Sequence, residues 1–165
     1  MTLFAADVFE ALQTQKSVVS YIFGHTGDAK EPLGAGFPKL LLARIIESAP
    51  ELSIDCPELL NPRRLRRLTT WAKVWDMLDN VLAHLKCLFL IVDRIDAIED
   101  PGNGVLLEDI ATELLALGAR HHQKLKILIT SINEPPKCIK DSRSMWWIFL
   151  STKKSLGEVR GLYRA

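Results

Sequence analysis

Apolar residues run without a polar break over residues 87–92 and end at Asp93. The run is short, most of its side chains are branched or aromatic, and charged residues lie on both sides of it. This pattern is typical of a β-strand that is buried on both faces, as in a parallel sheet covered by helices. The sequence therefore predicts a central strand over residues 87–92 with an acidic residue at its carboxyl end.

Three further segments have the composition of strands. Residues 17–24 are rich in β-branched and aromatic side chains, and residues 125–131 form an apolar run that ends in hydroxyl residues. Residues 145–150 read Met-Trp-Trp-Ile-Phe-Leu and are either a fourth strand or an apolar patch without a partner. Because such residues favour extended structure, we predict three strands and a candidate fourth.

Helical periodicity alternates with these strands. Apolar residues recur at the i, i+3, i+4, i+7 spacing over residues 70–85 and 105–123, and shorter amphipathic stretches cover residues 2–15 and 38–49. Strands that alternate with helices indicate an α/β fold with a parallel sheet and right-handed crossovers. We expect a three-layer α/β/α arrangement around a short parallel sheet of three to four strands.

Composition and charge narrow the class of protein. The 165 residues are 48% hydrophobic and 25% charged with a net charge of +1, which fits one folded domain with a sizeable core. This balance gives no general attraction for nucleic acid. Residues 63–67 read Arg-Arg-Leu-Arg-Arg, and Leu65 and Leu68 have the i, i+3 spacing of a helical turn. The four arginines are interpreted as the solvated face of that turn. We therefore expect no nucleic-acid partner.

Cysteine usage and hydropathy bear on the cellular compartment. Cys56, Cys87 and Cys138 are far apart and form no CxxC motif, which favours reduced thiols. The sequence has no signal-peptide pattern, and no apolar run approaches the ~18 residues that a membrane span needs. We expect a cytoplasmic protein with no membrane partner.

Asp93 is the first candidate for chemistry. An acidic residue at the carboxyl end of a buried parallel strand lies at the ligand-binding edge of the sheet. In proteins that hydrolyse nucleotides, a carboxylate in that position holds Mg²⁺ beside the terminal phosphates. The alternative is that Asp93 caps the turn that follows the strand. The strand pattern alone favours neither interpretation.

Two segments together resemble a known family. Residues 88–96 (LFLIVDRID) resemble the Walker B strand of signal-transduction P-loop NTPases, and residues 127–131 (ILITS) resemble their sensor-1 strand. Residues 18–24 are similar to the strand that follows the phosphate-loop helix in that class, which is known as STAND. The nearest likeness is to the NACHT-like, nephrocystin-3-type ATPase domains that are common in fungal proteins. The resemblance covers roughly residues 3 to 135.

The resemblance implies a set of nucleotide-site residues. By their positions in the family motifs, Asp93 would be the metal ligand, and Asp93, Asp96, Thr130 and Ser131 would contact nucleotide. The cofactor is unknown from the residues themselves, and Mg-ATP is the one expected if any nucleotide is bound. No catalytic residue is assigned.

The chain departs from the family pattern at three places. No GxxxxGK[ST] phosphate loop occurs in the 165 residues. Ala97 stands where the family often has the glutamate that orients water, and Ile132 stands where the sensor strand often ends in arginine. Because the loop amides and their lysine supply most of the phosphate binding, we expect this chain alone to bind nucleotide poorly.

These departures predict a truncated domain. Residues 1–136 would form a partial NTPase-like domain that lacks the first strand and phosphate loop, and residues 137–165 a charged linker, the candidate strand 145–150 and a basic tail. The family strand order resembles 5-1-4-3-2, so loss of the first strand leaves the outer edge of residues 125–131 bare. An uncovered apolar edge invites pairing. We expect residues 145–150 or a partner strand to protect it.

Three functions remain open on this basis. The first is a degenerate, non-catalytic STAND/NACHT-like module with a signalling or protein-interaction role, which binds a protein partner or self-associates through an exposed sheet edge. The second is an ATP-binding or ATP-hydrolysing signalling NTPase whose phosphate loop comes from missing upstream sequence or another chain. The third is an unrelated small α/β binding domain that merely shares these strand patterns, in which Asp93, Asp96 and Glu99 are turn and cap residues. A strand order other than the one that the resemblance implies would favour it.

Overall fold

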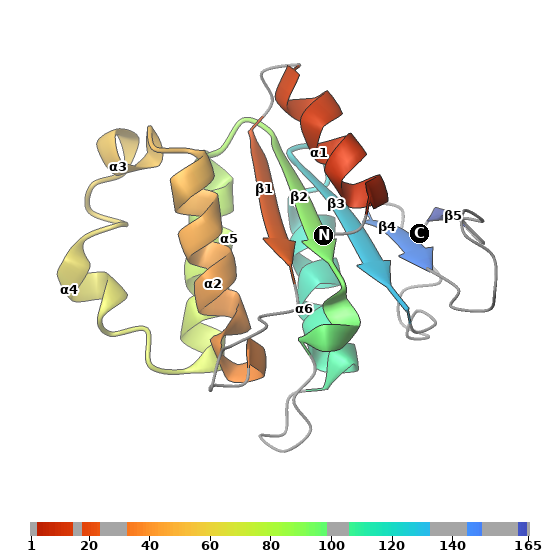
Figure 1. The fold of residues 1–165 in the computed structure, drawn as a ribbon. Helices are drawn as coiled ribbons and strands as arrows, with labels where there is room; N and C mark the ends of the chain where they lie inside the picture. Colours follow the sequence, from red (N-terminus) through yellow and green to blue (C-terminus); the bar gives the residue numbers. More distant parts are fainter. Residues whose placement is uncertain are drawn as a thin grey trace.

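A sheet of the order β1-β2-β3-β4-β5 organises the part of the chain that the structure describes (Figure 1). The structure, a computed structural model, describes residues 3–14, 18–23, 33–98, 106–132, 145–149 and 162–164. The strands are β1 (Val19–Phe23), β2 (Leu88–Asp93), β3 (Leu125–Ser131), β4 (Met145–Phe149) and β5 (Leu162–Arg164). The first four strands are parallel and β5 is antiparallel to β4. The predicted α/β class with a parallel sheet is confirmed.

Helices connect the strands of the sheet. They are α1 (Leu3–Thr14), α2 (Leu33–Ser48), α3 (Leu52–Asp55), α4 (Pro62–Leu65), α5 (Trp71–His84), the 3₁₀ helix η1 (Ile95–Ala97) and α6 (Leu107–Arg120). The start of α2 differs most from prediction, because Pro38 was interpreted as the first residue of the helix and in fact lies inside it.

The predicted strand order is confirmed. β2 lies between β1 and β3, with Val19 opposite Phe89 and Ile91 opposite Leu128. β4 pairs in parallel with the outer edge of β3, from Ile127 opposite Met145 onward, so the chain covers this edge with its own strand. The order β1-β2-β3 does not favour the unrelated α/β domain, which a different strand order would have supported.

Most of the core lies on the face of the sheet that α2, α5 and α6 cover. Apolar side chains of these helices, with Ile22, Leu90 and Ile127 from three strands, form one continuous buried cluster. Trp75 of α5 is buried in this cluster, and Trp71 is partly buried against it. The two rings lie 5.7 Å apart.

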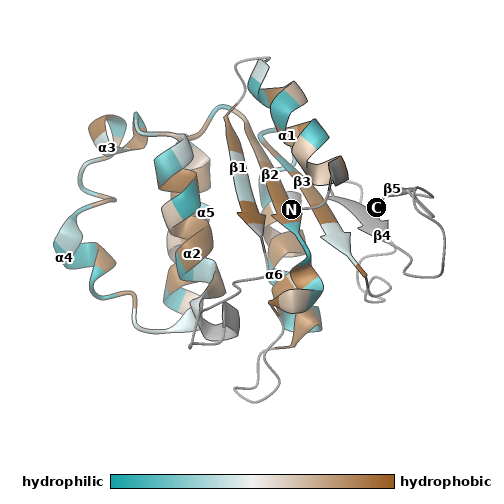
Figure 2. Ribbon diagram, viewed as in Figure 1, coloured by the Kyte–Doolittle hydropathy of each residue, from teal (hydrophilic) through white to brown (hydrophobic). Residues whose placement is uncertain are grey.

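α1 covers the opposite face, so the sheet is the middle of three layers (Figure 1). Ala5 is fully buried against Val19 and Ile91, and partly buried residues extend this second cluster. In Figure 2, brown marks hydrophobic residues and gives way to teal at the carboxyl end of β2, where the apolar run ends. That end of the sheet is where the candidate site residues lie.

The arginine segment forms the helical turn that the sequence predicted. Asn61 caps α4 by accepting a hydrogen bond from the Arg63 N–H (2.8 Å), and Pro62 is the first helical residue. The arginines of this segment are exposed, while Leu68 packs against the core. None of the helices that the structure describes has the length and apolar character needed to cross a bilayer.

Candidate functional site

The carboxyl ends of β2 and β3 bring two of the predicted site residues into contact. Val92 pairs with Ile129, so Asp93 and Thr130 end neighbouring strands at the same edge of the sheet. Both side chains are fully buried, and so is Ser131. Thr130 donates its hydroxyl proton to Oδ1 of Asp93. The structure therefore joins Asp93 and Thr130 directly.

Tyr21 of β1 makes a second hydrogen bond to the carboxylate of Asp93. Its hydroxyl donates to Oδ2 of Asp93 at 2.6 Å. Tyr21 pairs with Ile91 and Phe23 pairs with Asp93, so Tyr21 reaches the carboxylate diagonally, from two residues earlier on β1. Each carboxylate oxygen therefore accepts a hydrogen bond from a hydroxyl group, one from β1 and one from β3.

The sequence alone does not identify Tyr21 as a neighbour of Asp93. A signal for it exists in the two-residue period of strands, which places Tyr21 and Phe23 on one face of β1. The pairing register between β1 and β2 is also needed before Tyr21 can be matched to Asp93. The pKa of Tyr21 is raised above its usual range by burial and by its hydrogen bond to the carboxylate of Asp93. The phenol therefore stays protonated and remains a donor at neutral pH.

The hydroxyl of Thr130 has a second structural contact. Its oxygen accepts a hydrogen bond from the backbone N–H of Arg94 at 2.9 Å. A threonine hydroxyl has one proton to donate, and here that proton goes to Asp93. Thr130 thus fixes the first residue after β2 to the end of β3.

Asp96 braces the turn that follows β2. It accepts hydrogen bonds from the Arg94 guanidinium, the closest at 2.9 Å, and from the Ile132 N–H at 3.0 Å. Its side chain is only 5% exposed. Arg94 has a φ of 60°, an uncommon left-handed conformation for this residue type, and the hydrogen bond that its guanidinium donates to Asp96 raises the pKa of Arg94. The contacts of Asp96 are those of a turn residue.

These contacts bear on whether the site fits Mg²⁺. A protein carboxylate that binds Mg²⁺ offers an oxygen to the ion or to one of its waters. Both oxygens of Asp93 instead accept internal hydrogen bonds, and the carboxylate has no exposed surface. Among the described residues, no cluster of three or more His, Cys, Asp or Glu side chains is arranged to hold a metal ion. The described arrangement does not fit a metal held by Asp93.

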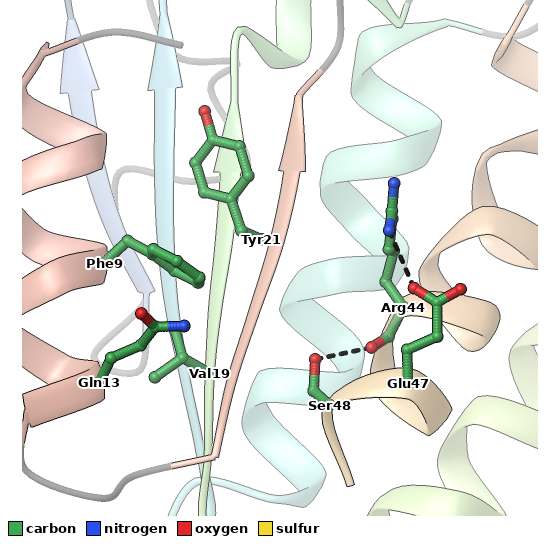
Figure 3. A pocket seen from close by; sticks show the side chains of 7 residues that line it. All are labelled: Phe9, Gln13, Val19, Tyr21, Arg44, Glu47 and Ser48. Carbon is green, nitrogen blue, oxygen red and sulfur yellow. Dashed lines mark hydrogen bonds and ion pairs between the residues drawn. The ribbon is translucent and has the colours of Figure 1, made fainter. Parts of the chain in front are cut away.

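A cavity of about 460 Å³ lies beside the outer edge of β1 (Figure 3). It is lined by Phe9 and Gln13 of α1, Val19 and Tyr21 of β1, and Arg44, Glu47 and Ser48 of α2. The Phe9 and Tyr21 rings meet edge to face, with centroids 5.6 Å apart. Across β1 from them, Arg44 and Glu47 form an exposed ion pair at 2.8 Å. The cavity therefore has an aromatic wall and a charged wall.

Comparison with known proteins gives one family. A family model described as nephrocystin 3, N-terminal, matches residues 2–132, which is well over half of the chain. The match runs from α1 to the end of β3 and leaves β4 and β5 outside. No curated protein and no solved structure gives a significant match.

Proposed function

Because this chain belongs to the nephrocystin-3 N-terminal family, which is NACHT-like, we propose that it is a non-catalytic member that acts as a protein-interaction module in signalling. The observation that carries the proposal is that Asp93 is fully buried and that both of its carboxylate oxygens accept hydrogen bonds from other side chains. In the resemblance described above, this residue would be the metal ligand of a nucleotide site. Here its carboxylate is used inside the protein, by Tyr21 and Thr130.

Energetics support this interpretation of Asp93. A hydrogen bond to a charged group contributes roughly 1.5–3 kcal/mol, so freeing either oxygen for a metal costs about that much before any ligand is gained. The usual compensation is phosphate binding by a glycine-rich loop and its lysine. The 165 residues contain no GxxxxGK[ST] sequence to supply it. Asp93 is therefore a poor metal ligand in this chain.

The position of β4 is a second support. In the family order 5-1-4-3-2, the strand that carries the phosphate loop lies beside the sensor-1 strand, which β3 resembles. In this protein β4 pairs with β3 on that side, in the same parallel sense, and β4 lies outside the family match. A phosphate-loop strand from any source would have to displace it. In the 165-residue chain β4 takes this position beside β3, which supports the non-catalytic proposal.

Isothermal titration with ATP tests the proposal. We expect no saturable heat up to about 1 mM ATP, with or without Mg²⁺, and the same result for Asp93→Asn. Saturable binding that requires Mg²⁺ and disappears in Asp93→Asn would contradict the proposal and restore Asp93 as a metal ligand. Phosphate release measured on the same samples is expected to equal the buffer rate.

One observation favours the alternative, an ATP-binding signalling NTPase completed by upstream sequence or another chain. Asp93 and Thr130 lie together at the carboxyl ends of adjacent strands, as a nucleotide site requires. This alternative predicts that a longer polypeptide carrying a GKT or GKS loop gains Mg²⁺-dependent ATP binding. It also predicts that the amides of β4 lose their protection from hydrogen exchange when that loop is present.

A further inference from the structure

We infer that the outer edge of β1, between α1 and α2, is a binding groove for an extended peptide of another protein, which adds to the sheet as a strand. This inference rests on the proposed interaction role and names the surface and the kind of partner. It moves the exposed sheet edge from β3, where the sequence analysis placed it, to the opposite side of the sheet, because β4 covers β3.

The backbone of β1 supplies the binding groups. The Phe89 N–H donates to the Val18 carbonyl at 2.9 Å, which sets the alternation of the parallel ladder. Ser20 and Ile22 therefore turn their N–H and C=O groups toward β2, and Val19 and Tyr21 turn theirs outward. β1 ends the strand order in the part of the chain that the structure describes, with β2 as its one neighbour. Two donors and two acceptors are available there to an added strand.

β1 also lacks the features that usually protect an edge. Exposed edges are commonly guarded by charged residues, proline or a bulge. The five residues of β1 read Val-Ser-Tyr-Ile-Phe and pair with β2 in unbroken register. A helix laid closely along an edge gives the same protection. α2 packs against β1, but a cavity of about 460 Å³ is lined by Val19 and Tyr21 of β1 and by Arg44, Glu47 and Ser48 of α2. That volume is within the range of ordinary ligand sites.

The walls of the cavity specify the partner. Successive side chains of a strand point to opposite faces, so an added peptide would send alternate residues toward α1 and toward α2. Toward α1 it would meet the aromatic pair Phe9 and Tyr21, and toward α2 the ion pair of Arg44 and Glu47 (Figure 3). The fitting partner is an extended segment in which apolar residues alternate with polar or charged ones. A helix or a compact small molecule would leave the backbone groups of β1 unpaired.

Hydrogen exchange followed by NMR tests the groove in the 165-residue chain alone. We expect the amides of Val19 and Tyr21 to exchange rapidly, and those of Ser20 and Ile22 to be protected by the ladder to β2. Protection of all four amides in a monomer would show that the edge is already covered and would overturn the inference. If sedimentation shows a dimer and all four amides are protected in it, the edge binds a second copy of this chain. This result would also overturn the inference.

Peptide selection tests the partner. The probe is a phage-displayed library of random nine-residue peptides selected on the full chain, followed by synthetic copies of the selected sequences. Val19→Pro removes an outward N–H at the first residue of β1, where proline breaks no ladder bond. Val19→Ala is the matched control, because it also truncates the side chain but keeps the N–H. Because Val19 lines the cavity, Val19→Ala measures the effect of the side chain alone, and we expect Val19→Pro to bind the selected peptides at least about tenfold more weakly than Val19→Ala does. Equal binding by the two variants would overturn the inference.

Modified peptides keep the test valid if Val19→Pro does not fold. N-methylation of every second amide of a selected peptide should abolish binding, and methylation of the intervening amides should leave it unchanged, since only one set faces β1. Binding that is insensitive to both N-methylation patterns, or a library that yields no binder, would overturn the inference. Such a result would leave the proposed function to its own test, the titration with ATP.

Discussion

At the scale of single residues, Asp93 is a fully buried carboxylate whose surroundings satisfy it. A buried carboxylate requires hydrogen-bond donors, because its transfer out of water is otherwise very costly. Tyr21 and Thr130 provide them from the strands on either side. The three side chains therefore tie β1, β2 and β3 together at one end of the sheet, and this role in stability can be measured apart from any ligand.

Tyr21→Phe tests that role through its pH dependence. At pH 8 we expect the free energy of unfolding to fall by about 1–2 kcal/mol, a value reduced for the partial exposure of Tyr21. The pKa of Tyr21 is raised in the folded state, so its contribution is complete below the unfolded-state pKa of about 10 and is lost as pH rises above it. Urea unfolding measures this effect. The difference in unfolding free energy between the unaltered chain and Tyr21→Phe should be smaller at pH 11 than at pH 8.

Thr130→Val is the matched control for this experiment. It removes the other donor to Asp93 without removing a group that titrates near pH 10. Its cost in unfolding free energy should therefore be the same at pH 8 and pH 11. If the cost of Tyr21→Phe also stays constant between these pH values, burial and the Asp93 carboxylate do not raise the pKa of Tyr21 in the folded state.

Asp96→Ala tests the brace of the turn after β2. The substitution leaves the Ile132 N–H and the Arg94 guanidinium without their acceptor, and we expect a loss of about 2–3 kcal/mol of unfolding free energy. Asp96→Asn keeps one oxygen for Ile132 and should cost roughly half as much. Urea unfolding measures both. Asp55→Ala, at an exposed position of α3, is the control, and an Asp96→Ala loss no larger than this control would refute the bracing role.

At the scale of elements, the Asp79 carboxylate on α5 links this helix to the carboxyl end of α6. Oδ1 of Asp79 on α5 accepts from Nε of Arg120 and interacts with Nε2 of His121, each at 2.8 Å. Burial alone raises the pKa of Asp79, but its hydrogen bonds to Arg120 and His121 outweigh burial, so the pKa is lowered. The tie joins the carboxyl end of α6 to the middle of α5.

Asp79→Asn should reveal this tie as a pH-dependent loss of stability. Because the pKa of Asp79 is lowered in the folded state, its contribution is present above the unfolded-state pKa of about 3.9 and is lost as pH falls below it. The side chain is 38% exposed, so solvent screening keeps the cost at pH 7 below about 1 kcal/mol. Asp76→Asn, an exposed position on the same helix, is the control, and equal effects of the two variants at pH 7 would rule out the tie.

The elements themselves could be predicted because their patterns are strong. The apolar run of β2 is short and bounded by charges, and α5 and α6 each carry a regular apolar stripe, so strand and helix differ clearly. β5 could not be predicted, because three residues are too few to show a period. The start of α2 was placed late because proline is a common helix start, and here the helix continues through it.

The candidate site was predicted only in part, for a reason of geometry. The strand order brings Asp93 and Thr130 together, and that order followed from the resemblance. Tyr21 was missed because a diagonal contact depends on the register between strands, which the sequence does not give. The motif around Asp96 likewise does not say whether its carboxylate turns toward a ligand or toward the turn.

At the scale of the whole molecule, the two sides of the sheet differ. On one side β4 and β5 extend the sheet beyond β3. On the other side β1 ends the sheet in the described part of the chain and borders a cavity with an aromatic and a charged wall. We propose that this NTPase-like module binds its protein partner at the outer edge of β1 and not at the carboxyl ends of β2 and β3.

We propose that the contacts of Asp93 inside the protein prevent it from binding metal or nucleotide. Paramagnetic Mn²⁺, added as a substitute for Mg²⁺ together with excess ATP, broadens the NMR signals of nuclei near any site that it occupies. The account predicts that the amide signals of Asp93, Arg94 and Thr130 keep their linewidths in the 165-residue chain. Selective broadening of these three signals, reversed by EDTA, would contradict it.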